Sequence, residues 1–261
     1  MMKKTFLALL AVGITTVLPA QVLISEFDFN SPGNSNSSGN TGTFSSIGGP
    51  TIAVASDTVN GGSSSPFGAS GARNLSGFPT QSTASGTAGA RVDVTTVGYT
   101  NLLYSGVIVE FDLRLSNTAS RWYRIDYTTD GTTFTLGTPT RIGVGDVNSG
   151  DTWTNNISFT ISDPATLNNP NFGFRVVSVF SPLAFTEHNT STNYAANTAY
   201  EAARNWTGSP NSAYNTASTW RFDMIQIYAI PIPEPGTYAL LAFSLVALVL
   251  VRRRLAKKSL A

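Results

Sequence analysis

The feature that most limits what this chain can fold into is its C-terminal segment, residues 231–261. An uncharged run covers residues 238–251, and the cations Arg252, Arg253 and Arg254 follow it directly. As a helix the run is about 21 Å long, or about 25 Å if it starts at Pro235. This is less than the roughly 30 Å hydrocarbon core of a bilayer, but arginine side chains can extend to the interface. A protein core buries unpaired cations only at great cost. We therefore expect a C-terminal transmembrane helix rather than a buried core helix.

The N-terminal segment, residues 1–20, has the order of features of a secretory signal peptide. Lys3 and Lys4 form a basic start, an apolar stretch covers residues 6–17, and Ala20 precedes the polar Gln21. This order predicts entry into the secretory translocon and cleavage after Ala20. Lys and Arg are enriched on the cytoplasmic flank of membrane helices. We therefore expect residues 238–251 to cross the inner membrane, with Arg252 inside and everything before Pro233 exported.

A short motif precedes the apolar run and completes a three-part C-terminus: Pro233, Glu234 and Pro235, then residues 238–251, then Arg252, Arg253 and Arg254. This order resembles the PEP-CTERM sorting signal of Gram-negative bacteria, over residues 231–261 only. The resemblance implies that a membrane enzyme called exosortase recognises Pro233, Glu234 and Pro235 and processes the protein near them. It also implies a link to exopolysaccharide and biofilm. The alternative is an ordinary single-pass anchor with a stiff Pro-Glu-Pro spacer.

Residues 21–230 are left as one exported domain with a composition of its own. They contain nine Arg, no Lys and fourteen acidic residues, which gives a formal charge of −5, whereas the whole chain has +1. A mildly acidic domain without clustered cations is a poor nucleic-acid binder. The absence of Cys excludes disulfides and cysteine metal sites.

Short apolar alternations run along this domain and indicate strands. The clearest of them cover residues 22–29, 91–97, 107–115, 122–128, 156–161, 172–179 and 220–229. Asp130-Gly131 predicts a hairpin turn, because Gly adopts positive φ at little cost. We expect an all-β fold, an antiparallel β-sandwich of jelly-roll type whose first and last strands lie close together. The Asp130-Gly131 hairpin, the strand at residues 171–175 and the final strand at residues 220–223 look like those of exported bacterial jelly-roll domains. This resemblance is looser than the one at the C-terminus, and it implies the same fold.

Other stretches of the domain lack a clear strand pattern. Residues 30–49 and 59–89 are rich in Ser, Gly, Asn and Thr, and we expect them to be long surface loops. Residues 195–204 form a weak helical pattern, which is the one helix expected outside the two terminal segments.

The search for catalytic groups yields few candidates. His188 is the only histidine, and it falls in a polar stretch with no Gly-x-Ser-x-Gly motif elsewhere to supply a serine nucleophile. Glu110 and Asp112 lie on one face of a predicted strand, about 7 Å apart, and could act as the acid pair of a glycosidase. Their alternation with apolar residues favours an exposed sheet surface instead. We expect no catalytic residue and no enzymatic activity.

Two binding sites remain as hypotheses. If the first and last strands adjoin, Glu26, Asp28 and Asp223 could converge into the oxygen-rich site that calcium prefers; the alternative is that these acids face solvent or pair with arginines, and no cofactor is required. For polysaccharide binding, Trp206 is the best candidate for an exposed platform, because Trp122 and Trp220 fall in predicted strands. The leading hypothesis is a non-enzymatic cell-surface or matrix protein. A carbohydrate-binding module is the alternative, and a glycan-active enzyme the third.

Overall fold

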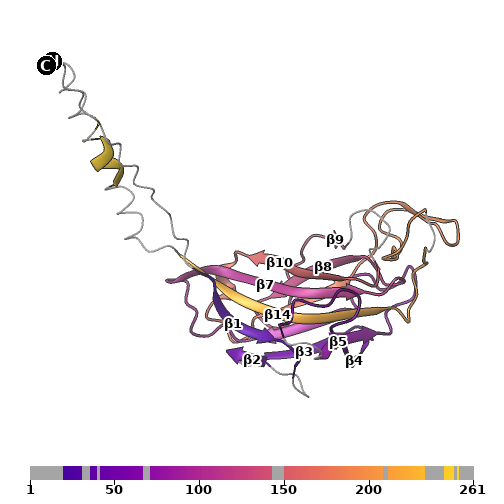
Figure 1. Ribbon diagram of the computed structural model, residues 1–261, viewed down its shortest axis with the longest axis horizontal. Helices are drawn as coiled ribbons and strands as arrows, with labels where there is room; N and C mark the ends of the chain where they lie inside the picture. The colour runs from indigo at the N-terminus through magenta and orange to yellow at the C-terminus, as the bar shows by residue number, and fades with distance from the viewer. Residues whose placement is uncertain are drawn as a thin grey trace, which may run out of the picture. The chain divides into compact units, whose positions relative to one another are not determined.

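A computed structural model describes residues 20–30, 36–39, 42–66, 71–142, 150–207, 211–232, 244–249 and 252. The alternation predicted around residue 110 forms the long strand β7 (Tyr104–Leu115) (Figure 1). Val107, Val109 and Phe111 are fully buried, whereas Glu110 is only half-buried. Successive side chains of a strand point to opposite faces, so this pattern presents one face to the core.

The strands β7 and β14 (Thr219–Pro231) lie in the first of two main sheets. Among the described residues, seven strands form it in the order β10 (Trp153–Ile161), β7, β14, β1 (Val22–Phe27) and β2 (Asn36–Gly39), with β5 (Gly71–Ser76) joining β14 to β4 (Thr51–Ser56). The first and last strands pair antiparallel, with Val22 opposite Ala229. The predicted closeness of the first and last strands is confirmed.

A second sheet packs against the first and carries the other half of the core. Its order is β3 (Gly42–Ile47), β6 (Gly89–Val94), β11 (Gly173–Ser178), β8 (Trp122–Thr128) and β9 (Thr140–Arg141). Outside these sheets, β12 (Phe185–Glu187) pairs with β13 (Thr192–Tyr194), and Pro164–Thr166 form one turn of 3-10 helix. The described domain is therefore all-β and antiparallel, as predicted.

Aromatic side chains fill the space between the two sheets. Phe44 of β3 lies with its ring centroid 5.2 Å from that of Phe29 and 5.9 Å from that of Phe222 on β14. Trp220 is fully buried and contacts Phe78, with the ring centroids 5.2 Å apart. Edge and tilted ring contacts at these distances are favourable, so the core interlocks both layers.

Two predictions about the less regular segments are wrong. Residues 30–49 and 59–89 are not only loops, because β2, β3 and β5 fall in them. Ser and Thr can adopt the extended conformation when neighbouring strands supply the hydrogen bonds. Phe44 and Leu75 are buried and fix these strands to the core, but they are single apolar residues in stretches whose overall composition is polar. Residues 195–204 contain turns and one bridge in place of the expected helix, because hydrogen bonds to other segments, such as Ala203 N to Ala119 O at 2.7 Å, take its backbone.

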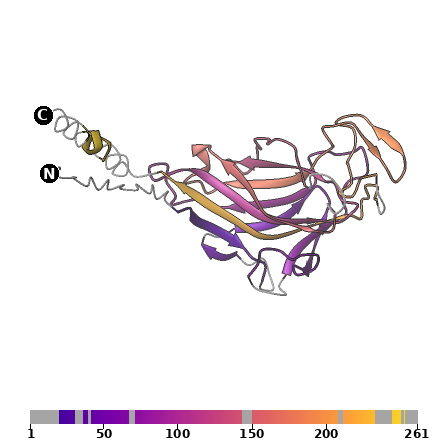
Figure 2. The same ribbon diagram turned by 45° about the horizontal axis from the view of Figure 1, so that its top comes forward.

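The sandwich has two distinct ends. At the proximal end, where β1 begins and β14 ends, lie the connections 95–103 and 162–172. At the distal end lie residues 179–207 and 211–218, which Figures 1 and 2 show as the orange loops opposite the start of β1. The C-terminal segment forms a separate unit from residues 21–230. Residues 244–249 and 252 of that segment are helical. In the described part of the chain, no helix reaches the length and apolar character needed to cross a bilayer.

Candidate functional site

The outer face of the second sheet gathers charged side chains in adjoining strands. Arg91 and Asp93 of β6 pair at 2.7 Å. Asp126 of β8 is fully buried and accepts from two arginines, Arg124 at 2.6 Å and Arg175 of β11 at 2.9 Å. We call Arg91, Arg124 and Arg175 the arginine face. Arg175 lies opposite Arg91 on one side and opposite Asp126 on the other, so Asp126 offsets the repulsion that two facing arginines would otherwise suffer.

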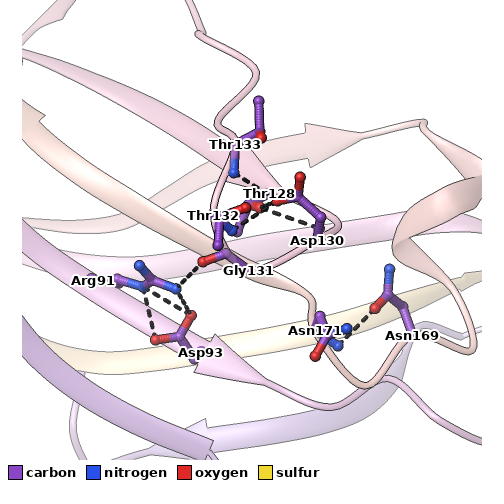
Figure 3. Close-up of polar contacts among 9 residues, drawn as sticks. All are labelled: Arg91, Asp93, Thr128, Asp130, Gly131, Thr132, Thr133, Asn169 and Asn171. Carbon is purple, nitrogen blue, oxygen red and sulfur yellow. Dashed lines mark hydrogen bonds and ion pairs between the residues drawn. The ribbon is translucent and has the colours of Figure 1, made fainter.

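The turn after β8 lies against Arg91 of the arginine face, as Figure 3 shows. Asp130 Oδ1 accepts hydrogen bonds from Thr133 N at 2.6 Å, Thr132 N at 2.7 Å and Thr128 Oγ1 at 2.9 Å. The bonds from the Thr133 and Thr132 amides hold the pKa of the Asp130 carboxyl well below its usual range. Gly131 has φ of 78°, as a turn glycine should. Asp130 therefore shapes the turn, and its ionised carboxylate is already satisfied.

Three further contacts attach this turn to the sheet. Arg91 Nη2 donates to Gly131 O at 2.8 Å. The ring of Phe134 lies over Arg175, with Cζ 4.2 Å from the ring centroid, and over Arg91 at 5.3 Å. Because the guanidinium groups are engaged by Asp93, Asp126, Gly131 and Phe134, the arrangement is suited to holding the turn. The sequence predicted the turn, but the role of the arginines was missed. The available signal was an Arg and an Asp two residues apart, and therefore on one strand face, in both β6 and β8.

A second polar cluster lies under residues 57–65, which cover the outer face of the first sheet. Asp112 Oδ1 accepts from Asn156 N at 2.8 Å and Oδ2 from Ser64 N at 2.5 Å. Asp223 Oδ2 accepts from Ser63 Oγ at 2.6 Å. Asp112 is 1% exposed, so the prediction that Glu110 and Asp112 both lie on an exposed surface is wrong for Asp112. The covering segment is rich in Ser and Gly, and nothing in its composition indicated that it packs on the sheet.

Burial dominates the electrostatics of this cluster. It raises the pKa of Asp223 to about 7, and the nearby charges of Asp57 and Asp112 add to the increase. Asp57, Asp112 and Asp223 are each at most 2% exposed. A buried acid that keeps its proton near neutral pH is a general-acid candidate in an open cleft, but here residues 57–65 cover it.

The predicted calcium ligands are distributed differently from the expectation. Asp223 faces Asp57 and Asp112, Glu26 lies opposite Gln226 in the β1–β14 register, and Asp28 accepts from Asn30 N at 3.2 Å. In the described ranges, no group of three or more His, Asp or Glu is placed to hold a metal ion. Calcium binding stays a prediction.

The distal loops are held by buried acids. Glu201 accepts from Trp122 Nε1 at 2.8 Å and pairs with Arg121 at 3.2 Å. Glu187 accepts from Tyr214 N at 2.9 Å. Sequence reasoning missed these two anchors; the signal was an isolated acid in an otherwise uncharged segment. His188 is exposed, and its backbone N–H donates to Asn205 Oδ1.

The aromatic candidates for sugar stacking occupy mixed environments. Trp122 and Trp220 are buried, as predicted. Trp206, expected to be exposed, is half-buried. Phe185 and Tyr194, both half-buried, face each other across the β12–β13 hairpin with ring centroids 5.1 Å apart.

The C-terminal candidates are only partly described. Arg252 is helical and exposed. Pro233, Glu234, Pro235, Arg253 and Arg254 lie outside the described residues, as do residues 1–19 of the expected signal peptide. The assignment of this segment therefore depends on its sequence.

That sequence matches a known family model. Residues 231–254 match the model described as the PEP-CTERM protein-sorting motif. The chain carries a PEP-CTERM sorting motif. The match starts at the last residue of β14 and includes Pro233, Glu234 and Pro235. It is consistent with an exosortase substrate and with an exported protein, and it confirms the predicted resemblance.

Solved structures give weaker likenesses. The Clostridium thermocellum xylanase 10B CBM22-1–GH10 modules are 13% identical, with 80% of this chain and 28% of that chain covered and a TM-score of 0.38. The Paenibacillus barcinonensis Xyn10C CBM22 tandem is 14% identical, with 80% and 50% covered and a TM-score of 0.41. The K1 cleaved adhesin domain of Porphyromonas gingivalis Lys-gingipain is 12% identical, with 72% and 97% covered and a TM-score of 0.32.

The chain spans half or less of the length of the first two structures, and TM-scores at this level support no conclusion about ligands. None of the curated proteins compared with the chain matches it.

Proposed function

We propose that this chain is a non-enzymatic surface or matrix protein, exported through the secretory translocon and processed by an exosortase-type enzyme. In this proposal residues 1–20 are removed, residues 238–251 cross the inner membrane transiently or permanently, and Arg252 lies in the cytoplasm. The all-β domain, with jelly-roll connectivity, is then displayed on the cell surface or released into an exopolysaccharide matrix.

One observation carries the proposal: the sorting motif begins where the folded domain ends. The match to residues 231–254 starts at Pro231, the last residue of β14. A processing enzyme acting near Pro233 would therefore cut between a complete sandwich and its C-terminal segment. The domain would be released without losing a strand.

The test is the intact mass of the protein recovered from membrane and extracellular fractions of its native cells. We expect a mass that ends near Pro233, and we expect it to disappear when the exosortase is deleted. Glu234→Ala should block processing, whereas the matched control Thr237→Ala should leave it intact. A mass that retains residues 252–261 in both strains would instead indicate an ordinary membrane anchor.

The absence of enzymatic activity is part of the same proposal. Asp112 is covered by residues 57–65, Asp130 is satisfied by its own turn, and His188 stands in an exposed loop. These placements support a domain without a catalytic site. Hydrolysis of a polysaccharide that is lost in Glu110→Gln would contradict this.

A second candidate function is carbohydrate binding at the distal end. It is favoured by the Phe185–Tyr194 pair, because half-exposed rings beside hydroxyl and amide groups can stack on sugars. Thr186 Oγ1 and Asn193 Oδ1 lie 2.6 Å apart on the same hairpin.

We expect Tyr194→Ala to weaken retention on a polysaccharide gel at least about tenfold, since stacking on an aromatic ring supplies much of such binding. Leu183→Ala is the control, because Leu183 is exposed on the same loop but is not aromatic. Unchanged retention in Tyr194→Ala and in Trp206→Ala would remove this candidate.

A further inference from the structure

The proximal end of the sandwich exposes apolar side chains that the core does not use. Leu102 is 84% exposed, Leu103 61% and Val97 51%, and all three belong to the β6–β7 connection. Val22, at the start of β1, is 37% exposed. We call Val22, Val97, Leu102 and Leu103 the apolar tip. Single exposed apolar residues are common, but several together at one end indicate a contact surface.

The connection that carries the tip is held firmly in place. Tyr99 donates from its hydroxyl to Leu23 O at 3.2 Å, and its own carbonyl accepts from Asn168 N at 2.9 Å. The rings of Tyr99 and Tyr104 pack together at 5.6 Å and lie against the core. A turn closed by Leu103 N donating to Thr100 O at 3.0 Å then presents the leucines. Because the two tyrosines occupy the space against the core, Leu102 and Leu103 remain outside it.

The surroundings of the tip carry little charge. Residues 94–109 contain no Asp, Glu, Lys or Arg. In the neighbouring connection, Asp163 accepts from Ala165 N at 2.9 Å and from the Tyr127 hydroxyl at 3.1 Å. An apolar phase could therefore take up the tip without stripping water from an unpaired charge.

The chain itself determines what lies near the tip. Ser105 Oγ donates to Ile230 O at 3.4 Å, so the start of β7 adjoins the end of β14. The seven residues 231–237 separate this point from the apolar run that begins at Tyr238. Fully extended, they span at most about 25 Å. While residues 238–251 are in a bilayer, the end of β14 can therefore lie no more than about 25 Å from the lipid.

We propose that the apolar tip docks on the lipid surface during the anchored stage, an inference that rests on the proposed function. Leu102 and Leu103 enter the interfacial region, where tyrosines such as Tyr99 and Tyr104 are also favoured. The domain has a formal charge of −5 and no Lys, so anionic headgroups repel it and burial of the apolar tip must drive the contact. Because salt screens this repulsion, added salt should not weaken the contact. Docking fixes the distal loops away from the membrane.

The natural chain contains no Cys, which allows a site-specific probe. Full-length Leu102→Cys is labelled with the environment-sensitive fluorophore NBD and reconstituted into vesicles of phosphatidylethanolamine and phosphatidylglycerol. Leu183→Cys is the matched control, because Leu183 is 56% exposed at the distal end. Doxyl-labelled lipid in the vesicles should quench the probe at position 102 at least about twofold, since interfacial side chains sit within reach of the acyl region. Quenching at position 183 should stay near that of free dye, and added salt should not reduce the quenching at position 102.

Flotation of the vesicles separates the possible failures. If the chain floats with the vesicles and position 102 is not quenched, docking is wrong while membrane anchoring stands. If the chain does not float, the anchoring in the proposed function is wrong, and docking falls with it. A blue shift at position 102 that grows with protein density but resists doxyl quenching would assign the tip to a second copy of the chain, which also overturns docking on lipid.

Discussion

At the scale of single residues, two aspartates show how position determines protonation. Asp130 is exposed and accepts hydrogen bonds from two amides, which lower its pKa. Asp223 is fully buried near two other carboxylates, and its pKa rises to about 7. The two aspartates therefore give opposite pH dependences to stability.

The pKa of Asp223 leads to a prediction for Asp223→Asn. Between the ordinary value of 3.8 and about 7, the folded state keeps a proton that the unfolded state has lost. This contribution therefore stabilises the fold at acidic pH and is lost as pH rises through about 7. Asn does not ionise, so the variant should melt higher than wild type at pH 8, by on the order of 5 °C, and about the same at pH 5. Circular dichroism melting at both pH values checks this.

Asp130→Asn is the control for the sign of this effect. Because the pKa of Asp130 is lowered in the folded state, its ionised carboxylate stabilises the fold at pH values above the usual pKa of a carboxyl. This contribution is lost as the pH falls. The variant should therefore be less stable than wild type at pH 7 and approach it in acid. Melting curves of both variants that run parallel to wild type at every pH would contradict the assigned pKa directions.

At the scale of elements, the turn after β8 is stabilised by its contacts with the second sheet. Phe134 covers Arg175 and Arg91, and each such cation–π contact contributes about 0.5–1 kcal/mol. Phe134→Ala should therefore lower the free energy of unfolding by about 1–2 kcal/mol, as measured by urea denaturation. Leu136→Ala is the control: Leu136 is 58% exposed in the same connection, and its change should stay within about 0.5 kcal/mol. Equal effects of the two substitutions would show that the ring contacts do not stabilise the turn.

Elements with a clear apolar alternation were predictable, and elements held by other segments were not. β7 follows from its own sequence, since Val107, Val109 and Phe111 form one buried face. β2 and β3 do not, because strand conformation in Ser- and Gly-rich sequence depends on the partner strand. Asp112 shows the same limit for the candidate site. Its place on β7 was predicted, but its burial depends on Ser64, which is 48 residues away in the sequence.

At the scale of the whole molecule, the chain divides into a domain and a C-terminal segment. The sandwich is complete at Pro231, and its core is built from its own two sheets. A chain of residues 21–232 should therefore melt cooperatively, within about 2 °C of the full-length protein in detergent, because the core contacts are the same. Differential scanning calorimetry checks this. An aggregated or non-cooperative product would show that the terminal segments stabilise the domain.

The position of β14 has a consequence for the timing of export. This last strand is also a central one, because β7 flanks it on one side and β1 and β5 flank it on the other. A chain that crosses the translocon from its N-terminus delivers β14 last. Until residues 219–231 emerge, the edges of β1, β5 and β7 lack their common partner. The apolar run follows only a few residues later. In the proposed export route, completion of the fold and arrival of the hydrophobic segment at the membrane would therefore fall at nearly the same moment. The chain would still be tethered while its strand edges are open, so it could not diffuse away in that state.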